Sequence, residues 1–547
     1  MSTRGHGILK NAFTVGAFTA LSRVLGLVRE MLQSRLIGAG VAQSAFTLAF
    51  ALPNMMRKLF GEGALTAAFV PVFKGELESS TKEAAAALAR SVMTMVMLML
   101  GAILVLAVGS LEVVEAMHDR FGVEDVHRFT LTIGLVKTLL PYMLFICAAA
   151  FGMGVVNALG RFKASSFMPC ILNFVWIGTL LWMWAAPSMD PDGRIHRVAI
   201  AILCAGAVQM AFMFWMMAKS GFSPLPSFSG WGNPKVRLVW RNVGIAAVGA
   251  GAVQINYMLD QFLAQLASPW AAGVIGYAER LMDLPLGIVG VAFGTVLLPT
   301  LAGLFAKDDL EGAKEALSSS LVSLMFVMIP AAVGLTILAH EVTGVIYQGG
   351  EFDAVATTRV ARALAVYSVG LGFFGLQKVA VPWFQAQNDM KTPLRVSVAA
   401  VVLNAALNIA AVLLLPVEWR HVGLAASTVV CAGAAASLLL VLARRRNGDL
   451  GLSRAVPSIV RITAAALTMG GAIAVLRPFS ARLFAFAGER AGGVMSLGLL
   501  VVAGVAAYSL CALVMMRKEL AAMRRHRAAP RRVASPQGGG RPAGGEM

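Results

Sequence analysis

Residues 88–110 read LARSVMTMVMLMLGAILVLAVGS, and no charged side chain follows Arg90 in this stretch. About 20 apolar residues in a helix, at a rise of about 1.5 Å each, cross the roughly 30 Å hydrocarbon core of a bilayer. The stretch does not alternate apolar with polar residues, as the strands of an outer-membrane β-barrel do. It therefore predicts a membrane-spanning helix.

Apolar windows of this kind recur along the whole chain. They predict an all-α polytopic membrane protein with about fourteen transmembrane helices. The windows lie at 8–32, 42–60, 88–110, 130–156, 165–186, 197–218, 241–263, 271–304, 316–339, 357–383, 393–415, 421–443, 456–476 and 493–516.

The composition of the 547-residue chain excludes a cytosolic enzyme. It is 58% hydrophobic and only 14% charged, with a mean hydropathy of +0.75. Soluble domains are about 45–50% apolar and about 25% charged. The five cysteines lie singly within apolar stretches and form no CxxC pair, so we expect neither disulfides nor a zinc site.

The net charge of +18 needs a separate explanation, because it could indicate nucleic-acid binding, contact with anionic lipid, or membrane topology. With the N-terminus inside, the inner loops collect far more Lys and Arg than the outer loops, as in Arg444–Arg446. An even number of helices then places both termini in the cytoplasm. We therefore assign most of the charge to topology and expect no nucleic-acid partner.

Two similarities between distant segments indicate an internal repeat. Residues 49–73 and 281–305 share a Leu-Pro, a stretch of glycine and small residues, and a later Pro. A second similarity pairs a segment that includes Asn173 with one that includes Asn404. Both have offsets of roughly 225 to 232 residues, which predicts a duplicated six-helix unit with a pseudo-two-fold axis along the membrane normal. The predicted parts are an N-terminal lobe at 1–220, a C-terminal lobe at 221–445, two extra helices at 446–516, and a basic disordered cytoplasmic tail at 517–547.

Ionisable side chains inside the predicted spans are the candidate functional residues. Each costs about 2.5–3.5 kcal/mol at the centre of a membrane helix and seldom faces lipid. Arg23 lies about 22 Å into the first span, too deep to reach the cytoplasmic surface by snorkelling. The alternative is that such cations merely end helices, and we favour it for Arg35 and Lys58. The cations at membrane depth are Arg23, Arg29, Arg57 and Arg280, and the acids beside them are Glu30, Glu62, Glu279 and Asp283.

Arginines that share a cavity repel one another unless an anion joins them. The nearby carboxylates offset part of that repulsion when the cavity is empty. A guanidinium binds phosphate oxygens with two parallel hydrogen bonds, so a pyrophosphate is a suitable guest.

A second polar group is expected where Asp260 meets Asn404 and Asn408. The two asparagines are spaced i, i+4 and so share a helix face. One carboxylate with amide oxygens suits a monovalent cation such as Na⁺, and plain interhelical hydrogen bonding is an equally good explanation. The chain has no phosphate loop, G-x-S-x-G or H-E-x-x-H motif. We therefore expect no cofactor, and active transport would draw on an ion gradient or the membrane potential.

Five stretches of the chain carry a resemblance to a known family. They are SRVLGLVRE (22–30), LPNMMRKLFGEGALTAAFVPVF (52–73), YAERLMDLPLGIVGVAFGTVLLPTL (277–301), YSVGL (367–371) and MKTP (390–393). They strongly resemble the MurJ/MviN lipid II flippases of the multidrug/oligosaccharidyl-lipid/polysaccharide exporter superfamily. The resemblance covers nearly the whole chain through the twelfth span and fades in the last two spans and the tail.

This resemblance implies a fold, a substrate and roles for residues. The family has two six-helix lobes around a central cationic cavity, and two C-terminal helices that form a groove for the lipid tail. Its members move the undecaprenyl-pyrophosphate-linked peptidoglycan precursor, lipid II, from the inner to the outer leaflet of the bacterial cytoplasmic membrane by alternating access. By this resemblance the cavity arginines fall on Arg23, Arg29, Arg57 and Arg280, and a sodium site falls on Asp260, Asn404 and Asn408.

The resemblance also implies a transporter rather than an enzyme, with Na⁺ or H⁺ as candidate coupling ions. Its implied partners are lipid II, membrane lipids and the machinery of cell-wall synthesis. One departure is Ser44, where many relatives carry an acid before Ala-Phe. The alternatives are an exporter of another lipid-linked oligosaccharide, a multidrug antiporter of the same superfamily, and a non-transporting scaffold.

Overall fold

The computed structural model describes residues 3–59, 64–117, 125–186, 189–228 and 232–515. Within these ranges it describes all side chains except those of 3–13, 64, 67, 245–250, 252–253 and 288–295.

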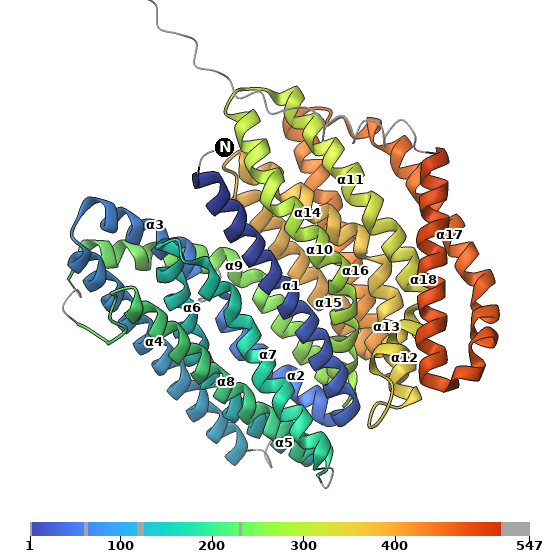
Figure 1. Cartoon of the computed structure of the whole chain (residues 1–547), viewed down its shortest axis with the longest axis horizontal. Coiled ribbons are helices and arrows are strands. Elements are labelled where there is room, and N and C mark those ends of the chain that lie inside the picture. The colour runs from blue at the N-terminus through green and yellow to red at the C-terminus, as the bar shows by residue number, and fades with distance from the viewer. Residues whose placement is uncertain (1–2, 60–63, 118–124, 187–188, 229–231, 516–547) are drawn as a thin grey trace, which may run out of the picture.

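Nearly all of this part of the chain is helical (Figure 1), and its only β feature is one bridge between Gly349 and Phe352. The helices are α1 (Thr3–Ile37), α2 (Val41–Met56), α3 (Ala64–Ser79), α4 (Lys82–Ala116), α5 (Val126–Leu139), α6 (Tyr142–Ala158), α7 (Phe162–Ala185), α8 (Pro191–Lys219), α9 (Pro234–Ala267), α10 (Ala271–Phe305), α11 (Leu310–Ile337), α12 (Ala339–Tyr347), α13 (Ala354–Val369), α14 (Leu371–Ala386), α15 (Lys391–Leu414), α16 (Val417–Asn447), η3 (Leu452–Arg454), α17 (Val456–Leu483), η4 (Ala485–Ala487) and α18 (Gly488–Met515).

Each of the fourteen predicted windows overlaps a helix or a pair of helices. Nine helices in the described residues are long and apolar enough to cross a membrane, and the bent pair of α13 and α14 would make a tenth. The four remaining windows coincide with α1, α2, α9 and α10. The all-α polytopic fold is therefore confirmed.

Two predicted spans are divided in the structure. The fourth consists of α5 and α6, which meet at Pro141, where the chain lacks a backbone N–H donor. The tenth bends by 42° where α13 meets α14 at Gly370. Two helices, α3 and α12, have no counterpart among the predicted windows.

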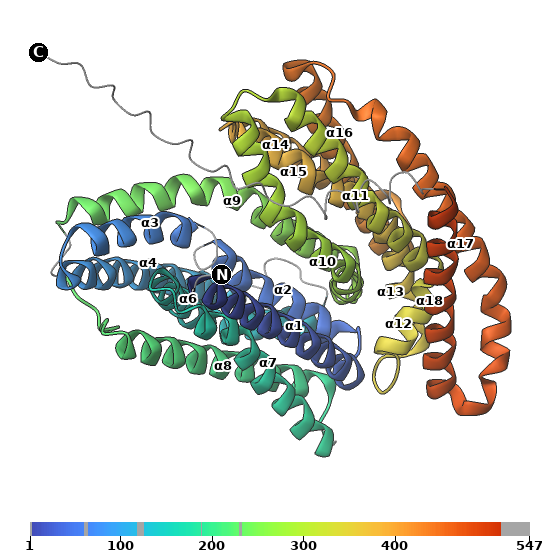
Figure 2. The ribbon, with the colours of Figure 1, turned by 45° about the horizontal axis from the view of Figure 1, so that its top comes forward.

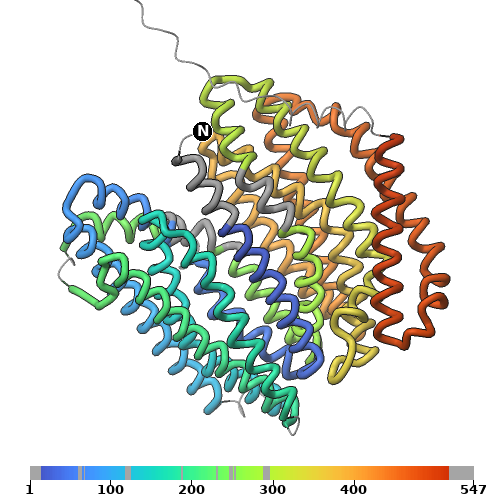
Figure 3. The backbone as a smooth tube through the Cα atoms, in the orientation of Figure 1, coloured from blue at the N-terminus to red at the C-terminus, as the bar shows by residue number. Residues whose placement is uncertain are grey.

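Two large hydrophobic cores divide the described helices into two bodies, which Figure 2 shows side by side. One core is built from residues of α1 to α8 with the start of α9. The other is built mainly from residues of α10 to α16 with the end of α9, and it includes Ile462 of α17 and Ala512 of α18. A smaller core holds α17 and α18 against α11. This C-terminal pair, red in Figure 3, forms one edge of the molecule.

The two bodies repeat the same packing scheme. In the first, α1 packs on α7, α2 on α5, and α6 on α8. In the second, α9 packs on α15, α10 on α13, and α14 on α16. This is the arrangement that a duplicated six-helix unit produces. The boundaries that we predicted at 220, 445 and 516 stay a prediction.

Helix α9 belongs to both bodies. Val236, Val239 and Val243 near its start are buried in the first core, and Lys235 forms an ion pair with Glu76 of α3. Its last turns are buried in the second core. The helix is continuous between these ends, so a single helix connects the two cores.

At one end of the molecule the two bodies are joined by hydrogen bonds. The Glu351 amide donates to the Arg35 carbonyl oxygen at 2.9 Å, in the loop that joins α12 to α13. Arg194 of α8 donates to the Leu36 carbonyl oxygen at 2.6 Å and lies 3.1 Å from the Glu351 carboxylate. Tyr277 of α10 donates to the Gly38 carbonyl oxygen at 3.2 Å. We call this set of contacts the end latch.

Two glycines allow the backbones in the end latch to approach. Gly38 and Gly350 have φ angles of +77° and +61°, values that L side chains rarely adopt. A Cβ atom on Gly38 would lie 2.6 Å from the Glu351 carbonyl oxygen, and one on Gly350 would collide with that of Arg35. The latch therefore depends on main chains that only glycine lets come this close.

Candidate functional site

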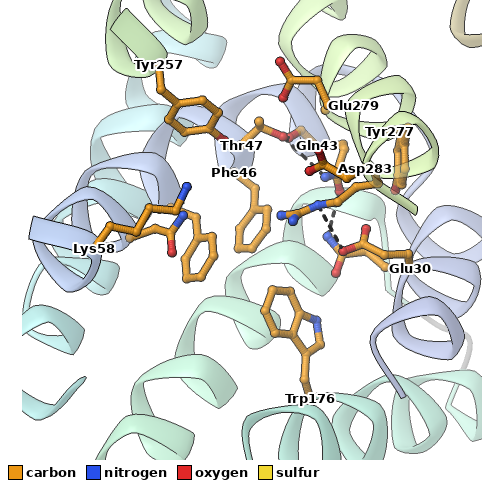
Figure 4. A pocket seen from close by; sticks show the side chains of 15 residues that line it. Glu30, Gln43, Phe46, Thr47, Lys58, Trp176, Tyr257, Tyr277, Glu279 and Asp283 are labelled. Atoms are coloured by element: carbon orange, nitrogen blue, oxygen red, sulfur yellow. Dashed lines mark hydrogen bonds and ion pairs between the residues drawn. The ribbon is translucent and has the colours of Figure 1, made fainter. Parts of the chain in front are cut away.

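A polar cavity lies where α1, α2, α7, α9 and α10 meet, between the two bodies (Figure 4). The empty space within it, which includes space open to solvent, is about 720 Å³. It is lined by Glu30, Gln33, Gln43, Phe46, Thr47, Phe50, Asn54, Lys58, Trp176, Tyr257, Gly276, Tyr277, Glu279, Arg280 and Asp283.

The Glu30 carboxylate lies between two guanidinium groups. Arg29 Nη2 is 2.6 Å from Glu30 Oε1, and Arg280 Nε is 3.6 Å from the same oxygen. The side chains of Arg29 and Glu30 are each 13% exposed, whereas that of Arg280 is 51% exposed. Because Glu30 is on α1 and Arg280 on α10, this ion pair crosses from one body to the other.

Arg29 is held on several sides. Its Nη1 donates to Asn173 Oδ1 at 3.1 Å, and its guanidinium carbon lies 4.3 Å from the centre of the Trp176 ring. Asn173 in turn donates to the carbonyl oxygens of Ser22 and Pro169. The Arg29 side chain is therefore fixed behind Glu30 and does not itself line the cavity.

Arg23 and Arg57 do not line the cavity either. Arg23 Nη2 donates to the Gly287 carbonyl oxygen of α10 at 3.3 Å, which makes a second contact between the bodies. Arg57 donates from Nε and Nη2 to Asn54 Oδ1 at 3.1 and 3.0 Å. Of the predicted set, the structure brings Glu30, Glu279, Arg280 and Asp283 to the cavity wall, and Glu62 lies outside the described residues.

Lys58 is a cavity residue that we expected only to end a helix. Figure 4 shows it on the opposite side of the cavity from Glu30, and its Nζ lies 5.3 Å from the centre of the Tyr257 ring. The signal for it was present in the sequence. Gln43, Thr47, Phe50, Asn54 and Lys58 follow one another at helical spacing and all line the cavity.

Two carboxylates of α10 offset the positive charges of Lys58 and Arg280 in the cavity. Glu279 and Asp283 are one helical turn apart and line the cavity on the same face. Glu279 Oε1 accepts a hydrogen bond from Tyr367 Oη at 3.5 Å. With Glu30, three carboxylates line the cavity beside two cations, Lys58 and Arg280.

The second predicted polar group is brought together by α9 and α15. Asn404 Nδ2 and Asn408 Nδ2 each donate to Asp260 Oδ1 at 2.6 Å. Asn256, which we did not predict, donates to Asp260 Oδ2 at 2.9 Å, one turn before it on α9. The Oδ1 atoms of Asn404 and Asn408 are buried and have no hydrogen-bond partner in the described part of the chain, so this cluster has unused oxygen ligands.

This cluster and the Arg29 cluster occupy equivalent places in the two bodies. Asp260 follows Arg29 by 231 residues, and Asn404 follows Asn173 by the same number. In one body Asn173 of α7 bonds Arg29 of α1, and in the other Asn404 of α15 bonds Asp260 of α9. The repeat therefore places a cation in one body where the other has an anion.

No group of three or more His, Cys, Asp or Glu residues in the described part of the chain has the geometry to hold a metal ion. The cysteines there are all free.

Comparison with known proteins assigns this chain to a family. The family model described as "Lipid II flippase MurJ" matches residues 33–495. The chain belongs to the MurJ lipid II flippase family. This confirms the resemblance seen in the sequence, and it confirms a membrane transporter rather than an enzyme. A multi-pass protein of the inner membrane follows from the family and from the apolar helices.

Curated relatives align with most of the chain. A probable lipid II flippase MurJ from Rhizobium tropici is 31% identical over 95% of this chain and 96% of its own length. The Lipid II flippase MurJ of Burkholderia cenocepacia is 30% identical over 85% of this chain and 89% of its own length.

Solved structures of MurJ and of a related transporter share the fold. A "Lipid II flippase MurJ, inward closed conformation" superposes with a TM-score of 0.72 at 21% identity, covering 92% of this chain and 99% of the other. An inward-facing MATE family transporter of the MOP superfamily gives a TM-score of 0.65 at 14% identity, covering 80% of this chain and 98% of the other. MurJ and MATE transporters are thus built on one helical plan.

Proposed function

We propose that this chain is a lipid II flippase that moves lipid II from the inner to the outer leaflet of the cytoplasmic membrane by alternating access. Besides the family, the observation that carries the proposal is the Arg280–Glu30 ion pair. It lies in a cavity between two bodies of helices and joins one body to the other.

Arg280 is the primary ligand for the pyrophosphate in this proposal. Among the residues that the structure describes, Arg280 has an ion-pair partner only at its Nε, 3.6 Å from Glu30, and half of its side chain is exposed. A guanidinium has five N–H donors in a planar fork that matches phosphate oxygens. An arriving pyrophosphate meets the terminal nitrogens of Arg280 and the ammonium of Lys58, and it competes with Glu30 for the cation.

The other predicted arginines act around this centre. Arg29 positions Glu30, while Arg23 and Arg57 lie on α1 and at the end of α2, beyond the cavity wall. In this proposal, Arg23 and Arg57 would contact the substrate as the two bodies move. Glu62, Glu279 and Asp283 complete the acidic set that balances the empty cavity, and Glu30 gates the contact between α1 and α10.

We place a coupling cation, Na⁺ or H⁺, at Asp260, Asn404 and Asn408. The buried amide oxygens without partners support this assignment. The polyprenyl tail would lie against α17 and α18. By the distribution of positive charge, both termini face the cytoplasm, and residues 517–547 are a cytoplasmic tail that could contact the cell-wall synthesis machinery.

The test is depletion of the protein in its own bacterium, followed by measurement of the lipid-linked intermediate on the inner leaflet. We expect lipid II to accumulate, and wild-type protein to reverse this. Accumulation of a different lipid-linked oligosaccharide would point to the alternative exporter, and no accumulation would contradict a flippase.

Arg280→Ala should fail to complement depletion while remaining inserted and abundant. Its control is Arg237→Ala, an exposed arginine that lies outside this cavity. Normal transport by the Arg280→Ala variant would remove the central role given to that side chain.

A further inference from the structure

A second cavity lies away from the one described above, where the loop between α14 and α15 meets the last turns of α16. It holds about 820 Å³ of empty space, much of it open to the surroundings. The MKTP motif at 390–393 forms part of its rim, and the proposed transport mechanism gives that motif no role. The cavity is lined by Phe384, Asp389, Lys391, Thr392, Arg395, Leu442, Arg445 and Arg446.

One carboxylate in this cavity faces four cations. Asp389 accepts hydrogen bonds from the Thr392 hydroxyl at 2.7 Å and the Thr392 amide at 3.0 Å, and it pairs with Arg446. The Thr392 hydrogen bonds and Arg446 lower the pKa of Asp389 to about 2, so this carboxylate is charged and compensates Arg446. No ion pair or side-chain hydrogen bond of Lys391, Arg395 or Arg445 is found among the described residues.

The position of two of these cations is unfavourable for the helix that carries them. Lys391 and Arg395 are one turn apart on the same face of α15, at its N-terminal end. The N-terminus of a helix carries partial positive charge and favours anions. Arg445 and Arg446, at the C-terminal end of α16, are explained by the opposite rule, but Lys391 and Arg395 are not. An anion bound between α15 and α16 would offset the positive charge at the N-terminal end of α15 and at the C-terminal end of α16.

The cavity is also suited to the phosphate of a lipid. Its floor includes the buried ring of Phe384 and the partly buried Leu442. Below Arg395, α15 exposes Val398 and Val402, at three and seven residues along the helix. A lipid whose phosphate sits among the cations could lay an acyl chain along this face.

We propose that this cavity is a binding site for a phosphate-bearing anion, held by Lys391, Arg395 and Arg445. The source of the phosphate is either an anionic lipid headgroup or a soluble phosphate at the same face. The site lies on α15 and α16 and is separate from the cavity that we assign to lipid II, so it does not depend on the proposed function.

The test measures the thermal unfolding midpoint of the full-length protein in detergent. Phosphatidylglycerol is titrated in one arm, phosphatidylcholine in a second, and inorganic phosphate at constant ionic strength in a third. The variant K391Q/R395Q/R445Q removes the three cations. Its matched control, R237Q/R241Q/R444Q, removes three exposed cations outside the cavity, of which Arg444 is next to Arg445.

We expect phosphatidylglycerol to raise the midpoint of the wild type and of the control by several degrees and to leave the cavity variant unchanged. A response to inorganic phosphate alone, lost in the same variant, would support the site with a soluble ligand. The charge-conserving variant K391R/R395K/R445K should keep the response, which distinguishes loss of binding from a folding defect. A wild-type response in the cavity variant, or an equal loss in the control, would overturn the proposal.

Discussion

At the scale of single residues, Glu30 balances two guanidiniums in the empty cavity. Glu30→Gln leaves Arg29 and Arg280 without their shared counterion, and a buried hydrogen-bonding group that loses its partner costs about 1–3 kcal/mol, with a higher cost for a charged group such as Arg29. We expect lower thermal stability and a larger stabilisation by added pyrophosphate than in the wild type. The exposed Glu78→Gln is the control. An unchanged melting temperature together with an unchanged pyrophosphate response would contradict the balancing role of Glu30.

Asp260 is the residue on which the proposed cation site depends. Asp260→Asn removes the negative charge of this side chain. The carboxylate that accepts hydrogen bonds from three asparagine amides is then replaced by a fourth amide. If Na⁺ binds there, Na⁺ in place of choline should stabilise the wild type by about 2.7 kcal/mol at a hundredfold excess over its dissociation constant. The effect should vanish in this variant and persist in the exposed Glu315→Gln. Equal stabilisation of both variants would show that sodium acts elsewhere.

At the scale of helices, α9 is fixed in two cores, so movement of one body against the other must bend it. Gly244 and Gly251 lie between its anchored ends, and a Cβ atom on either would meet no other atom within 4 Å. Gly-to-Ala changes stiffen a helix, and each favours the folded state by up to about 1 kcal/mol. We therefore expect G244A/G251A to be at least as stable as the wild type and slower in transport. Rapid transport by this variant would mean that α9 moves as a straight rod.

Much of the helical plan could be predicted from the sequence, because apolar windows of bilayer length are unambiguous. The breaks at Pro141 and Gly370 could not, since proline and glycine also occur within the continuous helix α10. The cavity was predicted in part. Glu30 and Arg280 stood out as charges at membrane depth, whereas Lys58 looked like a helix end. Asn256 was missed because a single amide carries no signal until α15 brings Asn404 beside it.

At the scale of the whole molecule, the end latch joins the two bodies at one end. In Gly350→Ala, a Cβ atom meets the Arg35 carbonyl oxygen while the backbone stays at a φ of +61°. We expect the bodies to separate at this end, and spin labels on exposed Val126 and Val355, in a chain with its native cysteines replaced, should report a longer distance. The control Gly448→Ala has a φ of +75° and no neighbour to collide with. An unchanged distance distribution would show that the latch tolerates the methyl group.

The equivalence of Arg29 and Asp260 has a consequence for the stoichiometry of transport. Each half of the duplicated molecule has an asparagine from its fifth span facing a charged residue of its first. In the first half the positive charge is covalently attached to the chain and cannot dissociate. In the second half the cation that we propose for Asp260 would come from solution and could return to it. On that proposal a gradient acts on only one of the two halves, and a coupled cycle exchanges one ion at these paired positions.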